Sequence, residues 1–117
     1  MAHYLIQISY TSEAWRTLIK NPQNRVEAVR PVIENLGGVI ENAWFTFGEY
    51  DVVWLIEMPE QVNIAAFSFA VSAGGAVKSI KTTPLISIED AVLSMQRAAE
   101  IEYQPPSNYL NVIEQNR

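Results

Sequence analysis

The chain has 117 residues, no cysteine and a formal net charge of −5. A single domain of this size can bury a core without disulfides, and the lack of a Lys/Arg cluster argues against binding the phosphate backbone of nucleic acids. No basic segment with a long apolar run opens the sequence and no run is long enough to span a membrane, so we expect a cytoplasmic protein.

The N-terminal third predicts a strand followed by helix. Residues 3–10 alternate between apolar and mixed positions, which is the period of a β-strand. Thr11 or Ser12 can cap a helix that is interrupted at Pro22 and resumes until Gly37, a common C-terminal stop. Pro31 lies inside the second helical stretch, so we expect a bend there.

The middle of the chain predicts a hairpin, a helix and a strand. Two apolar runs, residues 39–47 and 52–58, flank the sequence Gly-Glu-Tyr-Asp and indicate a β-hairpin. A helix begins at Pro59, and its nearly all-apolar body predicts burial on more than one side. It ends at Gly74, and residues 76–86 predict a further strand.

The C-terminal part predicts one more helix and an arm. Pro84 near the end of the preceding strand indicates an edge position, and Ser87 is a good helix cap. We divide the chain into a domain over residues 1–100 and an arm over residues 101–117, which we expect to pack on a neighbouring subunit because it is too apolar for a disordered tail. The apolar residues of this arm are Tyr109, Leu110, Val112 and Ile113.

The element order β-α-β-β-α-β predicts an α+β, ferredoxin-like fold with an extra C-terminal helix. Its sheet would be antiparallel, with both helices on one face. The strand over residues 52–58 carries Val52 and Trp54 on one side and Val53 and Leu55 on the other. A sheet face without helices should carry polar residues, but this one carries apolar residues. We therefore expect a second copy of the chain to cover it, giving a homodimeric α/β barrel.

Three blocks of sequence carry a family resemblance. Gly48, Tyr50 and Asp51 in the hairpin, with "RVEAVRPVIENLGG" before and "IKTTPL" after, resemble the GYD domain family over about residues 2–100. The resemblance implies membership of the dimeric α/β barrel superfamily and a mostly bacterial distribution, and it assigns no activity. The hairpin is also similar to the effector-binding domain of Lrp/AsnC-type regulators. No helix-turn-helix precedes the first strand, so we expect no DNA-binding role of that type.

The hairpin corner and the single histidine are the candidates for catalysis. Asp51 either bonds its own backbone as a turn residue or, with Tyr50, forms the rim of an effector pocket. His3 is either a partly exposed residue at the start of a strand or a general acid/base. No second histidine or acidic pair accompanies it at ligand spacing, so we predict no metal site and no cofactor.

Five further residues are candidates for ligand binding. Lys81 and Thr82 either hold an anion or, for the lysine, protect an edge strand. Arg30 reaches a ligand carboxylate or lies on a helix surface. Trp44 and Trp54, on adjacent strands, are expected on the same face, as core, interface or ligand wall. Each reading stays open from the sequence.

Two classes of function and one structural role follow. The first is a homo-oligomer that binds a small organic ligand, carboxylate-bearing or aromatic, between sheet and helices or at the subunit seam. The second is a cofactor-independent enzyme of the monooxygenase, isomerase or lyase type that uses His3, Tyr50 and Asp51. The third is a structural oligomer docked through the arm. Whether a reaction is catalysed is left open by the sequence.

Overall fold

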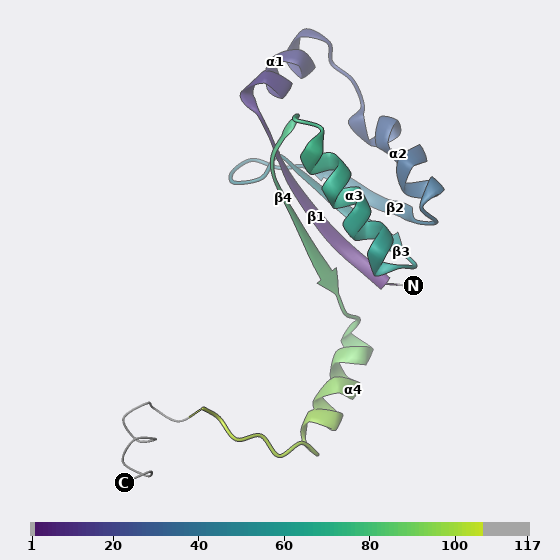
Figure 1. The fold of residues 1–117 in the computed structure, drawn as a ribbon, viewed down its shortest axis with the longest axis vertical. Helices are drawn as coiled ribbons and strands as arrows, with labels where there is room; N and C mark the ends of the chain where they lie inside the picture. Colours follow the sequence, from purple (N-terminus) through teal and green to yellow (C-terminus); the bar gives the residue numbers. More distant parts are fainter. Residues whose placement is uncertain (1, 107–117) are drawn as a thin grey trace. The chain divides into compact units, whose positions relative to one another are not determined.

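The computed structural model describes residues 2–106 and falls into two compact units, one up to Ile86 and one from Ser87 onward (Figure 1). The second unit contains α4 (Ile88–Ala98). The first unit is built from β1 (Ala2–Tyr10), α1 (Ser12–Lys20), α2 (Arg25–Asn35), β2 (Val39–Phe45), β3 (Val52–Met58), α3 (Gln61–Ala73) and β4 (Val77–Leu85).

The four strands form one antiparallel sheet in the order β2-β3-β1-β4. This is the strand order of a ferredoxin-like fold, so the predicted α+β topology is confirmed. β4 is an edge strand, and Pro84, which cannot donate a hydrogen bond to a ladder, lies within it as the sequence indicated.

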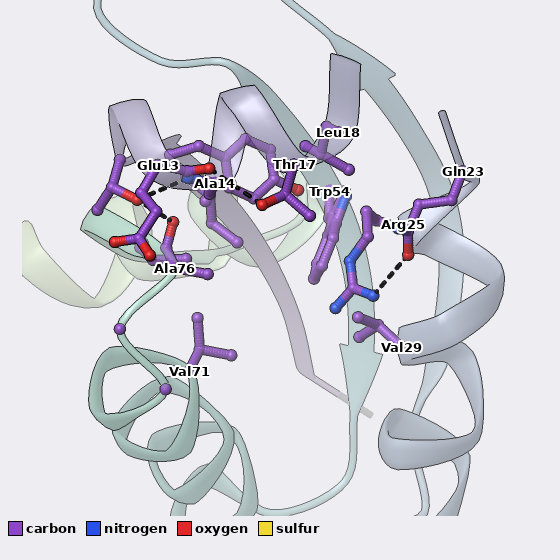
Figure 2. A pocket seen from close by; sticks show the side chains of 16 residues that line it. Glu13, Ala14, Thr17, Leu18, Gln23, Arg25, Val29, Trp54, Val71 and Ala76 are labelled. Carbon is purple, nitrogen blue, oxygen red and sulfur yellow. Dashed lines mark hydrogen bonds between the residues drawn. The ribbon is translucent and has the colours of Figure 1, made fainter. Parts of the chain in front are cut away.

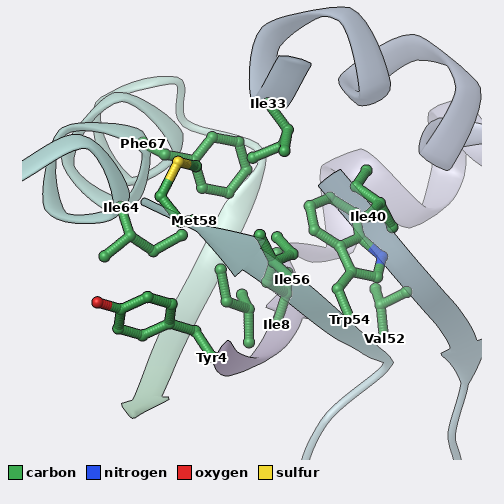
Figure 3. Close-up of a cluster of buried hydrophobic side chains, with 11 residues drawn as sticks. Tyr4, Ile8, Ile33, Ile40, Val52, Trp54, Ile56, Met58, Ile64 and Phe67 are labelled. Atoms are coloured by element: carbon green, nitrogen blue, oxygen red, sulfur yellow. The ribbon is translucent and has the colours of Figure 1, made fainter. Parts of the chain in front are cut away.

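The hydrophobic core lies between the sheet and α2 and α3 (Figure 3). Even-numbered residues of β1 and β3 face these helices, because side chains alternate along a strand. Ile6 and Ile56 are completely buried there. Ile33 of α2 and Phe67 of α3 are among the helix residues buried against them. The buried residues from the strands are Tyr4, Ile6, Ile8, Ile40, Val52, Trp54, Ile56 and Met58.

Local signals set the helix ends close to the predicted positions. The Thr11 hydroxyl accepts a hydrogen bond from the backbone N–H of Ala14, and the Asn24 side chain accepts from the first turn of α2. Pro22 separates α1 from α2, whereas Pro31 lies inside α2 without ending it. Ser87 caps α4 by accepting from the N–H of Asp90.

We call the side of the sheet opposite the core the open face. Odd-numbered residues of β1 and β3 project from it, and cross-strand pairing sets Leu5 beside Leu55 and Gln7 beside Val53. These side chains are half-buried in the single chain, and no element of the first unit covers them. The prediction of apolar residues on both faces of the sheet is therefore confirmed.

One prediction about α3 is wrong within the first unit. Its body is apolar nearly all round, yet only Ile64 and Phe67 are buried. Val62 and Phe69 are 74% and 73% exposed, because α3 touches the sheet along one stripe. The apolar end of the C-terminal arm, predicted to pack on a neighbour, lies outside the described residues.

Candidate functional site

A pocket of about 620 Å³ lies between the core side of the sheet and α1, α2 and α3 (Figure 2). This volume is in the range of sites for small organic molecules. Its walls are largely apolar, because the strands contribute residues that face the helices and each helix contributes apolar residues that face the sheet. The main apolar residues are Ile8, Trp54 and Val77 from the strands and Leu18, Val29 and Val71 from the helices.

Arg25 is the cation of this pocket. It is the first residue of α2, and its guanidinium donates a hydrogen bond to Oε1 of Gln23 at 3.1 Å. Among the described residues no carboxylate lies within ion-pair distance of it. Figure 2 shows Arg25 between Trp54 and Val29, with the acidic Glu13 at the opposite side of the pocket. One side of the pocket is therefore suited to an anion.

Tyr10 adds a neutral hydrogen-bonding group to the same lining. Burial raises the pKa of its phenol above the ordinary value; the nearby Arg25 charge opposes this shift and Asp51 adds to it. The phenol therefore stays protonated at neutral pH and can donate a hydrogen bond. Together, Tyr10 and Arg25 offer a donor and a positive charge beside an apolar wall.

Trp54 carries an unsatisfied polar atom. The residue is only 2% exposed and lines the pocket, and its indole Nε1 has no hydrogen-bond partner among the described residues. A buried donor without an acceptor costs about 1–3 kcal/mol, so most buried polar groups in proteins have a partner in the protein or in ordered water. Trp54 is the predicted binding residue that the structure places in this pocket.

The Gly-Glu-Tyr-Asp corner is held by hydrogen bonds within the fold. The Asp51 carboxylate accepts from the backbone N–H of Tyr10 at 2.8 Å and from Nε1 of Trp15 at 3.2 Å. Gly48 has φ +130°, a conformation that side chains disfavour, as expected for a glycine in this hairpin. Asp51 thus ties the β2–β3 loop to β1 and α1, which is a structural role.

The three catalytic candidates do not come together. His3 pairs with Glu57 at one end of the β1–β3 ladder, whereas Asp51 precedes Val52, the partner of Ile8 at the other end. At about 3.3 Å per residue, the five residues from His3 to Ile8 span roughly 16 Å. Tyr50 belongs to the Asp51 end, so His3 does not share a site with the corner.

The remaining binding candidates are spread over three places. Lys81 pairs with Gln7 and projects from the open face. Thr82 projects from the core side and shares a hydrogen bond with Ser68 of α3 at 2.9 Å. Arg30 pairs with Glu27 at 3.1 Å and lines a groove along α2 and β2, away from the pocket.

The expectation that the two strand tryptophans share a face is wrong. Trp44 pairs with Val53, while Trp54 pairs with Ala43, so their side chains project from opposite faces. The cause is a β-bulge between Ile40 and Asn42, which inserts one residue and reverses the alternation beyond it. Trp44 lines the groove beside α2 instead of the pocket.

Two polar residues that line the pocket, Tyr10 and Arg25, were missed from the sequence. Tyr10 could have been found, because it continues the even-numbered face of β1 that points into the core. Arg25 follows a proline break and is one of several charged residues near a helix start, so no pattern distinguishes it. The side chains of His3, Glu41 and Glu57, which are of metal-binding types, also converge, although they come from three separate strands.

The sheet order and the helix-covered face define an α+β protein of ferredoxin-like topology. The family model of the GYD domain matches residues 4–93, and the chain belongs to the GYD domain family. The resemblance seen in the three sequence blocks is therefore confirmed. Among residues 2–106 no helix is long and apolar enough to cross a membrane.

Two solved structures are similar to this chain. One is the crystal structure of FFRP-DM1, with 15% sequence identity and a TM-score of 0.47, covering 74% of this chain and all of that one. The other is a hypothetical protein, PHS023 from Pyrococcus horikoshii, with 15% identity and a TM-score of 0.45, covering 74% of this chain and 92% of that one. No curated protein matches the chain in sequence.

Proposed function

We propose that this protein binds a small organic monocarboxylate with an aromatic or branched apolar body in the pocket between the sheet and α1, α2 and α3. The observation that carries the proposal is Arg25, a pocket cation without a carboxylate partner among the described residues. A guanidinium beside an apolar wall binds a carboxylate through two parallel hydrogen bonds.

The other pocket residues favour a ligand of that shape. The protonated Tyr10 phenol can donate to a ligand oxygen, and the apolar walls can bury a hydrocarbon or ring. Glu13 at the opposite side disfavours a second negative charge there. A monocarboxylate therefore fits the charge pattern better than a dicarboxylate does.

Trp54 supports the proposal independently. Its indole Nε1 is buried without an acceptor in the described residues, and the ring forms part of the pocket wall. An oxygen acceptor that reaches this nitrogen from the pocket, from a ligand or a ligand-associated water, would remove this cost. Trp54→Phe keeps an aromatic wall and removes the donor, so it separates the two contributions.

The test compares an acid with its uncharged analogue. Phenylpropionate and phenylpropionamide differ at the group that meets Arg25, and we expect the acid to raise the Tm and to bind at least about tenfold more tightly in calorimetry. Arg25→Gln should remove that preference. The control Arg16→Gln, on the exposed side of α1, should leave it unchanged.

Equal binding of the acid and the amide would contradict the proposal. So would a panel of aromatic and branched aliphatic monocarboxylates in which none raises the Tm. A preference for the acid that survives Arg25→Gln would move the anion site to another cation.

The proposal includes a second copy of the chain on the open face. Leu5, Val53 and Leu55 lie close together there, and α1, α2 and α3 contribute residues to the core and pocket on the other side of the sheet. Light scattering should give twice the chain mass of 13.2 kDa, and Leu55→Glu should halve it. The control Val62→Glu, on the exposed side of α3, should leave the mass unchanged. A wild-type monomer, or dissociation by the control alone, would contradict this pairing.

A further inference from the structure

Three metal-ligating side chains converge on the open face, one from each of three neighbouring strands. His3 belongs to β1, Glu57 to β3 and Glu41 to β2, and one ligand atom from each lies within 4.8 Å of the others. We propose that these residues bind a divalent metal ion of the Zn²⁺ type. The cluster lies on the opposite side of the sheet from the pocket, so this site is independent of the proposed carboxylate binding.

The sheet itself places two of the ligands. His3 and Glu57 are direct cross-strand partners, and both project from the open face. Side chains in such pairs have Cβ atoms about 5 Å apart. An imidazole and a carboxylate at that spacing can meet around one ion without any movement of the backbone.

The β-bulge in β2 places the third ligand. In a regular ladder one residue of β2 would lie opposite Leu55. Here two residues, Glu41 and Asn42, occupy that position. Bulges change the direction of a side chain and are frequent next to functional sites. Here the bulge leaves the Glu41 carboxylate 3.1 Å from Nε2 of His3.

The distances fit a small ion with only side-chain adjustment. Ligand atoms about 2.1 Å from a tetrahedral Zn²⁺ lie ~3.4 Å from one another. The His3–Glu41 separation of 3.1 Å is close to this value, and the third atom must move in from at most 4.8 Å. In the single chain the side chains of His3 and Glu41 are 46% and 30% exposed, so the ion can enter before a second copy binds, and there is room for water as a fourth ligand.

The local charge also favours a cation. Two carboxylates meet one imidazole, and Glu57 has no ion pair or side-chain hydrogen bond among the described residues. An imidazole nitrogen with carboxylate oxygens suits Zn²⁺, which binds such sites more tightly than Mn²⁺, whereas Mg²⁺ prefers oxygen ligands and water. The alternative is a plain His3–Glu41 ion pair, which would not need Glu57.

The test uses the full chain without an affinity tag. Calorimetry with Zn²⁺ should show one ion per chain, bound more tightly than Mn²⁺ or Mg²⁺. His3 is the single histidine of the sequence, so its imidazole resonances report the site without ambiguity, and they should shift on Zn²⁺ addition. His3→Gln and Glu57→Gln should each weaken Zn²⁺ binding at least about tenfold, because each removes one of three ligands.

Glu34→Gln is the matched control, because Glu34 is an exposed glutamate of α2 outside the cluster. It should leave Zn²⁺ affinity unchanged, and the amide spectrum of each variant verifies that it is folded. Zn²⁺ binding that is equal in wild type, His3→Gln and Glu57→Gln would overturn the site. So would His3 resonances that do not respond to millimolar Zn²⁺, or binding that requires His3 and not Glu57.

Discussion

The two faces of the sheet come from the same strands and have different surroundings. On the core side, α2 and α3 cover side chains such as Ile6 and Ile56 completely, and the pocket lies where α1, α2 and α3 leave space above the sheet. On the open face, neighbouring positions such as Leu5 and Leu55 are half-buried, and polar side chains lie among them. One face is therefore covered by helices of the first unit, whereas those helices leave the other face uncovered.

The largest expected effect is the difference in stability lost when a side chain is truncated on the core side and on the open face. Ile56→Ala removes a fully buried side chain and should lower the free energy of unfolding by about 2–5 kcal/mol, measured by urea denaturation. Leu55→Ala, the next residue along β3, should cost less. Its cost should also grow with protein concentration, because the proposed second copy would shelter Leu55. Equal costs at all concentrations would remove the distinction between the faces.

The corner that joins the two strands of the hairpin gives the next largest effect. Asp51→Ala leaves the N–H of Tyr10 and the indole N–H of Trp15 without their acceptor and should cost about 1–3 kcal/mol. Asp51→Asn keeps one oxygen acceptor and should cost less. If both variants unfold at the wild-type urea concentration, the structural role of Asp51 is wrong.

The smallest effect appears only at alkaline pH. Burial raises the pKa of Tyr10, so the folded state holds the phenolic proton more tightly than the unfolded state does. This contribution to stability is complete below the ordinary tyrosine pKa of about 10 and is lost as the pH rises through the higher folded value. When the pH is raised from about 9 to about 11, the free energy of unfolding of Tyr10→Phe should therefore fall less than that of the wild type. Parallel pH profiles would contradict the raised pKa.

Alternation and turn chemistry were readable from the sequence. The even-numbered residues of β1, the glycine corner at Gly48 and the Ser87 cap all follow from local rules that the structure keeps. The element order then leaves few topologies, which is why the sheet order agrees with the prediction.

The bulge in β2 could not be predicted from the sequence, and it accounts for one wrong expectation and for one cluster of side chains that was missed. A regular strand would set Trp44 on the same face as Trp54; the extra residue at Glu41 reverses the alternation. The same bulge leaves Glu41 beside His3 and Glu57, a cluster that sequence spacing hides because its members come from three strands. Arg25 was missed because its significance depends on which carboxylates lie near it, and that is decided by tertiary packing.

The most direct test of the proposed pocket uses the three tryptophans as reporters. Trp54 lines the pocket, Trp15 bonds the hairpin corner through its indole, and Trp44 lines the groove beside α2. Their indole N–H signals, assigned with single Trp→Phe variants, can be followed in a ¹⁵N spectrum during titration with phenylpropionate. We predict that the Trp54 signal shifts with saturation while the Trp44 signal stays in place. A shift of Trp44 without Trp54 would contradict the account and move the ligand away from the helix-covered pocket.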